Sequence, residues 1–130
     1  MLPAWIGVWT LTAVLSTDPS ASTLYKRGTK HIDSTGTSVT IVDDFVRSRG
    51  GILHLEWTGQ FDGRDYPVQG VELALTSAYR QVDERTLELV QKIDGATVLT
   101  ARITLSAEGK TVTTESSDGR SKTTTTYKKR

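Results

Sequence analysis

Residues 86–105 read TLELVQKIDGATVLTARITL, and this stretch decides the class of fold. From Leu99 to Leu105 apolar side chains occupy every second position, the period expected of a strand with one buried and one exposed face. Asp94-Gly95 separates this run from an equally β-rich one, and such a pair is typical of hairpin turns because glycine accepts positive φ. The stretch therefore predicts two antiparallel strands joined by a tight turn.

The same turn signal recurs along the chain, at Asp62-Gly63, Glu108-Gly109 and Asp118-Gly119. The segments between the turns are rich in β-branched and aromatic residues, and none has a convincing helical period. About nine strands are predicted, over residues 6–16, 22–30, 38–46, 51–61, 71–79, 86–93, 97–105, 110–116 and 121–128. Sequential hairpins need no crossover, so we expect an all-β, antiparallel up-and-down barrel of about 8–10 strands rather than a sandwich.

Length and composition exclude several classes of protein. A chain of 130 residues is expected to form a single domain, residues 1–130, because it is too short for two separate cores. Its 16 Lys and Arg against 15 Asp and Glu do not create the field that holds a polyanion, so no nucleic-acid partner is expected. Without cysteine there is no disulfide, thiolate metal site or cysteine nucleophile.

The first seventeen residues carry no charge and superficially resemble the apolar part of a secretion signal. No Lys or Arg precedes Lys26, however, and two tryptophans interrupt the run, so we expect a first core strand instead of a signal or a membrane span. The sequence leaves localisation open between a cytoplasmic protein and an exported one whose signal has been removed.

Two motifs carry a resemblance to a known family. Gly7-Val8-Trp9 resembles the G-x-W signature of lipocalins and related calycin barrels, in which the tryptophan closes one end beneath a basic side chain of the last strand. The resemblance gives that place to Trp9, with the basic partner among residues 128–130. Trp5 has the same parity as Trp9, so we expect it to plug the same end.

Residues 62–70, DGRDYPVQG, are similar to the D-G-K-D-Y-P-V-x-G stretch of small bacterial lipocalin-like proteins, with Arg64 where that group usually has lysine. The likeness runs from residue 51 to the end and is weaker over residues 18–49, which usually frame the mouth of the cavity. It implies a barrel that encloses a cavity and brings no catalytic residues with it. Tyr66-Pro67 is expected to play a structural role after the turn.

His54 and Glu56 are the first candidates for proton transfer. They lie two apart on one predicted strand and so point the same way, which would let the carboxylate orient the imidazole. A catalytic role requires that this face line the lumen. The alternative is that Leu53, Leu55 and Trp57 face inward and that His54 and Glu56 are solvated.

Other side chains are candidates for holding a ligand. Arg102 could bind a ligand carboxylate if it points inward, or else form a cross-strand ion pair on the surface. Tyr25 and Tyr79 could reach a ligand through their hydroxyls, and Trp57 and Phe45 supply apolar contacts.

Two further groups of polar residues have weaker signals. Asp43 and Asp44 are adjacent and therefore point to opposite faces of a strand; one could face inward, but an exposed edge or bulge is expected. His31 and Asp33 have the spacing of two ligands on one strand, which His54 could complete. With two histidines and no thiol, we expect no metal site and no cofactor.

Three functions remain open. The preferred one is binding of a small hydrophobic or amphipathic molecule in the barrel lumen. The second is a cofactor-free isomerase, cyclase or hydrolase, for example in natural-product biosynthesis, that uses the same lumen with His54 and Glu56 as proton-transfer groups. The third is a structural or interaction module whose interior is filled by side chains.

Overall fold

The structure, a computed structural model, describes residues 3–130, which form ten strands and one short 3₁₀ turn, η1 (Ala21–Thr23). The strands are β1 (Gly7–Ser16), β2 (Tyr25–Thr35), β3 (Ser38–Arg47), β4 (Ile52–Gly59), β5 (Tyr66–Gln69), β6 (Leu75–Asp83), β7 (Thr86–Ile93), β8 (Ala96–Leu105), β9 (Thr111–Ser117) and β10 (Lys122–Lys129). Over these residues, no helix has the length and apolar character needed to cross a membrane.

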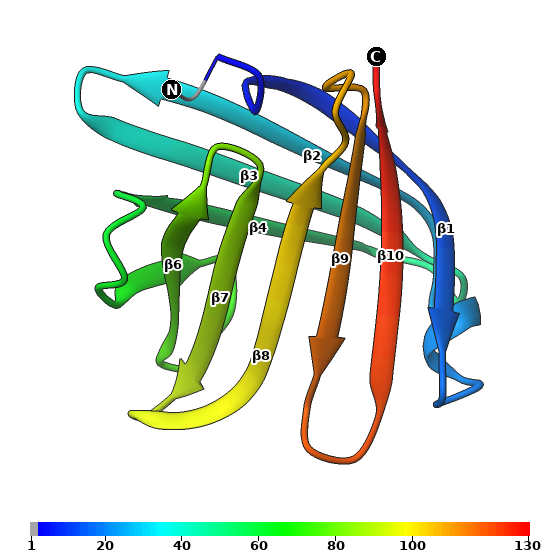
Figure 1. Cartoon of the computed structure of the whole chain (residues 1–130). Helices are drawn as coiled ribbons and strands as arrows, with labels where there is room; N and C mark the ends of the chain where they lie inside the picture. Colours follow the sequence, from blue (N-terminus) through cyan, green and yellow to red (C-terminus); the bar gives the residue numbers. More distant parts are fainter. Residues whose placement is uncertain (1–2) are drawn as a thin grey trace.

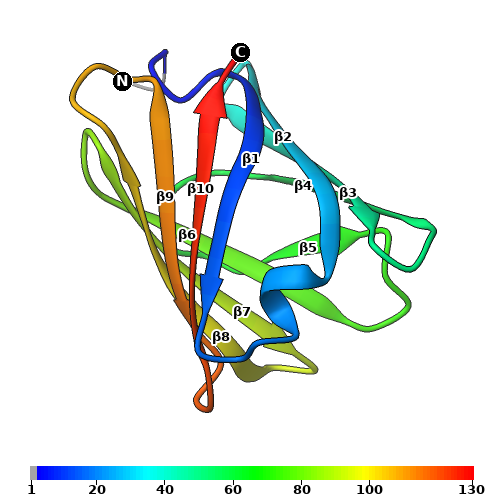
Figure 2. The same cartoon turned by 90° about the vertical axis from the view of Figure 1, so that its right-hand side faces the viewer.

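The strands close into an antiparallel up-and-down barrel, which confirms the predicted fold class. Each strand pairs with its neighbour in sequence, and β1 also pairs with β10, so the barrel is closed all the way round. Figure 1 shows β2, β3 and β4 crossing behind the upright strands β6 to β10. In Figure 2, β1 lies beside β10, and the start of β1 is at the same end as the end of β10.

Three strand assignments from the sequence are wrong. β5 lies where the sequence predicts a turn, because its four residues include Pro67 and are too few to show alternation. β6 runs over Leu75–Asp83 rather than 71–79, since residues 71–73 form bends after Gly70. The second strand begins at Tyr25 instead of residue 22, because residues 21–23 form η1, and it continues to Thr35.

Trp5 and Trp9 close one end of the barrel, as expected from their shared parity. Both are 0 % exposed. The Trp9 indole N–H donates to the carbonyl of Trp5 at 3.0 Å, and the Trp5 indole N–H donates to the carbonyl of Glu84 at 3.1 Å. Lys129 supplies the basic side chain above the ring, with Nζ 5.3 Å from the Trp9 ring centroid. These contacts fix the start of β1 to the end of β10.

The DGRDYPVQG stretch has a structural role. Asp62 Oδ1 accepts from the backbone N–H of Arg64 at 3.0 Å, and Asp62 Oδ2 accepts from the Tyr66 hydroxyl at 2.8 Å. The Tyr66 ring then packs edge-on against Trp57, with centroids 5.7 Å apart. Gly59 permits this packing, because a Cβ there would lie 2.5 Å from the Tyr66 ring. The motif thus anchors the short strand β5 to the core.

Candidate functional site

The lumen is lined by side chains that share a strand face with the buried core, and it has two kinds of wall. Strand alternation and register place apolar residues on one wall and hydroxyl residues on the other. The apolar wall includes Leu53 and Leu55 of β4, Leu75 of β6, Leu89 of β7 and Leu99 of β8. The polar wall consists of Ser16 of β1, Thr114 and Ser116 of β9, and Thr123 and Thr125 of β10.

Inward-facing side chains are less completely buried in the middle of the barrel than at its closed end. Leu55, Leu99 and Thr125 face inward near the middle of their strands, yet they are only partly buried. In a barrel filled by its own side chains such positions would be fully buried, as Ile103 and Val112 are near the closed end. The inner surface is therefore more completely packed at the tryptophan end than in the middle of the barrel.

Strands β9 and β10 have few apolar residues, and their inward-facing hydroxyl groups form the polar wall. Ser16 Oγ and Thr123 Oγ1 are 2.7 Å apart and share a hydrogen bond on the inner face. Gln91 Nε2 donates to Ser77 Oγ at 3.1 Å within the same lumen. β9 and β10 thus line a polar part of the interior, which gives the lumen an amphipathic character.

A charged pair lies inside the barrel next to the closed end. Lys30 of β2 and Asp43 of β3 are directly opposite each other in register, and Nζ is 2.7 Å from Oδ1. Their side chains are only 15 % and 17 % exposed. Burial, the largest single effect, lowers the pKa of Lys30, but the attraction and hydrogen bond of Asp43 together with the nearby Tyr127 and Tyr79 outweigh it, so the net pKa lies well above the usual lysine value. Lys30 is therefore charged at neutral pH, and its Nζ lies 5.5 Å from the centroid of the Tyr127 ring.

This pair corrects our expectation that Asp43 and Asp44 lie at an exposed edge. Both belong to the regular strand β3, between β2 and β4, where adjacent residues face opposite sides. Asp43 faces inward to Lys30, whereas Asp44 faces outward and contacts His54. Sequence reasoning missed Lys30 as a site residue altogether, because lysine is rarely buried and its partner lies on another strand.

Trp57 and Tyr79, both predicted to bind a ligand, are buried in an aromatic cluster on the inner face. Their ring centroids are 4.7 Å apart, and the Phe61 ring is tilted towards Tyr79 with centroids 5.7 Å apart. The Trp57 indole N–H donates to the carbonyl of Ser77 at 2.9 Å. Burial raises the pKa of Tyr79 to about 12, so its hydroxyl stays neutral. The cluster forms a rigid base of the lumen.

Tyr25 and Phe45, also predicted ligand contacts, lie together towards the open end. Their rings stack with centroids 4.6 Å apart, and both residues are partly buried. Gly28 of β2 sits opposite Phe45, and a Cβ there would lie 2.9 Å from its ring. The absent side chain makes room for Phe45 against the wall.

His54 and Glu56 do not face the lumen, which corrects the first candidate for proton transfer. Trp57 faces inward on β4, so residues of the opposite parity face out, and the side chains of His54 and Glu56 are each 50 % exposed. The His54 Nδ1–H donates to Asp44, and Nε2 lies 3.5 Å from Glu56 Oε1. The hydrogen bond to Asp44 raises the pKa of His54, with Glu56 adding to it. The cluster is a solvated surface network.

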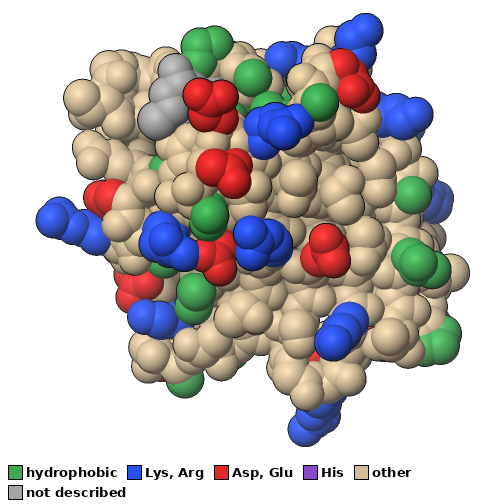
Figure 3. Space-filling view, viewed as in Figure 1, with side chains coloured by type: hydrophobic (Ala, Val, Ile, Leu, Met, Phe, Trp, Pro, Cys, Tyr) green, Lys and Arg blue, Asp and Glu red, His purple; other side chains and the backbone are tan. Residues whose placement is uncertain are grey.

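Arg102 also points outward, so it is no anchor for a carboxylate inside the lumen. It is exposed and lies in register between Glu88 and Glu115. Arg80 extends the row through its ion pair with Glu88. Figure 3 shows positive and negative side chains alternating across this face.

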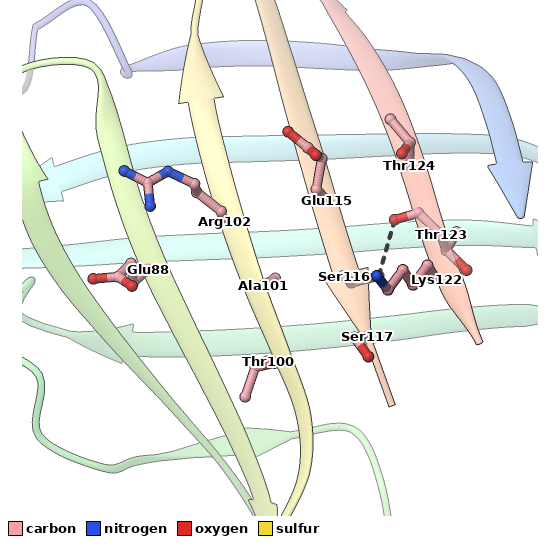
Figure 4. A pocket seen from close by; sticks show the side chains of 10 residues that line it. All are labelled: Glu88, Thr100, Ala101, Arg102, Glu115, Ser116, Ser117, Lys122, Thr123 and Thr124. Atoms are coloured by element: carbon pink, nitrogen blue, oxygen red, sulfur yellow. Dashed lines mark hydrogen bonds between the residues drawn. The ribbon is translucent and has the colours of Figure 1, made fainter. Parts of the chain in front are cut away.

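A groove of about 430 Å³ lies on the same outer wall, over β7 to β10. Figure 4 shows Arg102 and Glu115 at this groove. Ser116 Oγ donates to the carbonyl of Thr123 at 3.3 Å beneath it. The groove is lined mainly by outward-facing charged and hydroxyl side chains, and Ser116 and Thr123 of the polar wall also contribute to it.

The structure does not assemble the facial set of His31, Asp33 and His54. His31 and Asp33 are exposed on β2, and within residues 3–130 no cluster of three or more His, Cys, Asp or Glu could hold a metal ion.

No protein-family model matches the sequence, and no curated protein does either. Solved structures do match. The Schistosoma mansoni fatty acid binding protein in complex with arachidonic acid is similar at 16% identity and a TM-score of 0.73, over 99% of this chain and 98% of that one. The wild-type fluorescent protein UnaG is similar at 14% identity and a TM-score of 0.70, over 100% of both chains. A fatty acid transporter, REP1-NXSQ, is similar at 12% identity and a TM-score of 0.70, over 97% of this chain and 96% of that one. These likenesses establish the barrel fold.

Proposed function

We propose that the protein binds one small hydrophobic or amphipathic molecule inside the barrel. The observation that carries this proposal is the incomplete burial of inward-facing side chains such as Leu55, Leu99 and Thr125, in contrast to the fully buried side chains at the tryptophan end. Apolar surface that remains accessible to water inside a barrel gains free energy when a ligand covers it, about 25 cal/mol per Å². Two of the structurally similar proteins are a fatty acid binding protein and a fatty acid transporter, which supports the same class of function.

The ligand contacts follow from the two walls. The hydrocarbon part would lie against Leu55, Leu99 and Phe45, and Tyr25 beside Phe45 would border the open end. Trp57 and Tyr79 would form the base of the site through their packed rings. Polar atoms of the ligand would face the hydroxyl wall of β9 and β10.

The resemblance of DGRDYPVQG to small bacterial lipocalin-like proteins is consistent with this role, and we propose that the chain is one of them. The enzymatic alternative is less well supported, because its candidate proton-transfer groups, His54 and Glu56, face solvent rather than the lumen.

The experiment is a dye-binding titration with a matched pair of variants on one strand. Thr125 faces the lumen, whereas Thr124 points outward at the groove of Figure 4. Thr125→Phe should fill part of the lumen and weaken binding of a neutral, environment-sensitive dye by about tenfold or more. Thr124→Phe should leave the affinity unchanged. Equal affinities for the two variants, with both folded by circular dichroism, would show that the dye binds elsewhere.

A further inference from the structure

The charge inside the lumen determines which kind of head group the site can accept. Register places Lys30 and Asp43 on the inner face, beside Trp9 and Tyr127. Between the closed end and the rim, they are the two charged side chains at inward-facing positions of the strands described by the structure. Their Nζ and Oδ1 atoms are 2.7 Å apart, so each neutralises the other.

A neutralised pair responds to a charged ligand differently from a lone lysine. An unpaired buried ammonium would attract a fatty-acid carboxylate strongly, because the low local dielectric magnifies the attraction. Here a carboxylate placed at Lys30 would also lie next to Asp43 and meet a like charge. An ammonium head group would meet Lys30 in the same way. Either ion would lose its hydration shell without a net gain in charge pairing.

An uncharged hydroxyl fits the same pair well. Lys30 has three N–H donors and Asp43 has two acceptor oxygens, and in residues 3–130 their mutual contact is the one hydrogen bond formed by either head group. A ligand hydroxyl can accept from Lys30 and donate to Asp43 at the same time. The neutral phenol of Tyr79 and the Ser and Thr hydroxyls of the polar wall favour the same chemistry.

We propose that the lumen selects uncharged hydroxyl-bearing amphiphiles, such as long-chain alcohols, over fatty-acid anions and alkylammonium cations, and that the Lys30–Asp43 pair imposes this selection. This inference rests on the proposed lumen-binding function. It distinguishes this chain from proteins of similar fold that hold fatty acids, such as the one solved with arachidonic acid.

The first test compares three compounds with one hydrocarbon chain and different head groups: decanol, decanoate and decylammonium. Isothermal titration calorimetry near neutral pH, where the last two are ionised, gives their affinities for the wild-type protein. Decanol should bind about tenfold more tightly than either ion, equivalent to about 1.4 kcal/mol. Decanoate binding as tightly as decanol, or more tightly, would overturn the inference without any variant being made.

The second test uses the two adjacent aspartates as a matched pair. Asp43→Asn leaves Lys30 without its counter-charge, so the affinity for decanoate should rise by more than about tenfold, which is enough to overtake that for decanol. Asp44→Asn changes the outer face and should keep the wild-type order. If folded Asp43→Asn does not gain affinity for decanoate, the pair does not set the selection. Should Asp43→Asn fail to fold, Lys30→Met provides the reverse test, with decylammonium gaining affinity.

The outcomes of these tests distinguish a failure of the proposed head-group selection from a failure of the proposed ligand binding in the lumen. If the dye is sensitive to Thr125→Phe but the three decyl compounds bind equally, the lumen is a binding site and the head-group selection is wrong. If Thr125→Phe leaves the affinity for the dye unchanged and no decyl compound binds, both proposals are wrong.

Discussion

The inner and outer faces of strand β3 carry two ion pairs built from adjacent aspartates, and their surroundings differ sharply. Inside, Asp43 contacts Lys30, with side chains 17 % and 15 % exposed. Outside, Asp44 contacts His54, with side chains 45 % and 50 % exposed. One peptide bond therefore separates a pair screened from bulk water by the barrel wall from a pair that bulk water surrounds.

The difference shows that the contribution of an ion pair to stability depends on whether the pair lies inside or outside the barrel. The outer pair is screened by water and salt, so it contributes little to stability. The inner pair is costly to desolvate, and each partner depends on the other once both are inside. Evidence for a functional role therefore lies with the inner pair, although only the outer histidine matched the usual signature of a catalytic group.

The largest effect is expected from removing the aromatic plug on the inner face. Trp9→Ala should lower the free energy of unfolding by about 3–5 kcal/mol, because the fully buried indole seals the barrel and anchors the chain to Trp5. Chemical denaturation measures the loss. Leu15→Ala, on the outer face of the same strand and 76 % exposed, is the control and should change stability little. A loss below about 1 kcal/mol for Trp9→Ala would mean that the ring does not close the barrel.

Breaking the inner ion pair should have the next largest effect. Lys30→Met leaves Asp43 inside the barrel without its partner, which should cost about 3 kcal/mol at neutral pH. Lys26→Met removes an exposed lysine of the same strand and is the matched control. Comparable losses in the two variants, measured by urea unfolding, would show that the inner pair is solvated as freely as the surface.

The inner pair also predicts a loss of stability in alkaline solution. The folded pKa of Lys30 lies above its unfolded value, so its contribution is complete below the unfolded pKa of about 10.4 and is lost as pH rises towards the folded pKa. The stability gap between wild type and Lys30→Met should therefore narrow above about pH 10.4. Tyr79 remains in both proteins, so the gap mainly reports Lys30. A gap that stays constant in this range would mean that the lysine pKa is not raised.

The fold could be predicted from the sequence because both of its signals, the alternation of apolar residues and the turns at acidic residue–glycine pairs, come from residues that are close together in the chain. Residues 86–93 form a strand with the bounds predicted from the sequence, and Trp9 occupies the closed end. β5 was missed because a four-residue strand containing Pro67 has no detectable period. For the site, parity correctly placed Trp57 opposite His54 on β4, but it did not by itself identify the inward face. Lys30 and Asp43 meet only through the register of β2 with β3, which no hydrophobic pattern records.

The smallest effect is expected at the outer pair, and NMR is the suitable measurement. The hydrogen bond to Asp44 raises the pKa of His54 above 6.5, so Asp44→Asn should lower the pKa obtained from titrating the imidazole resonances. The protonated ring adds a small stabilisation that is complete below about pH 6.5 and is lost as pH rises through the folded pKa. His54→Gln should remove this weak pH dependence while leaving ligand affinity unchanged, since the ring lies outside the lumen. Loss of ligand binding in folded His54→Gln would contradict the claim that the outer face takes no part in binding, and would make His54 a candidate binding residue.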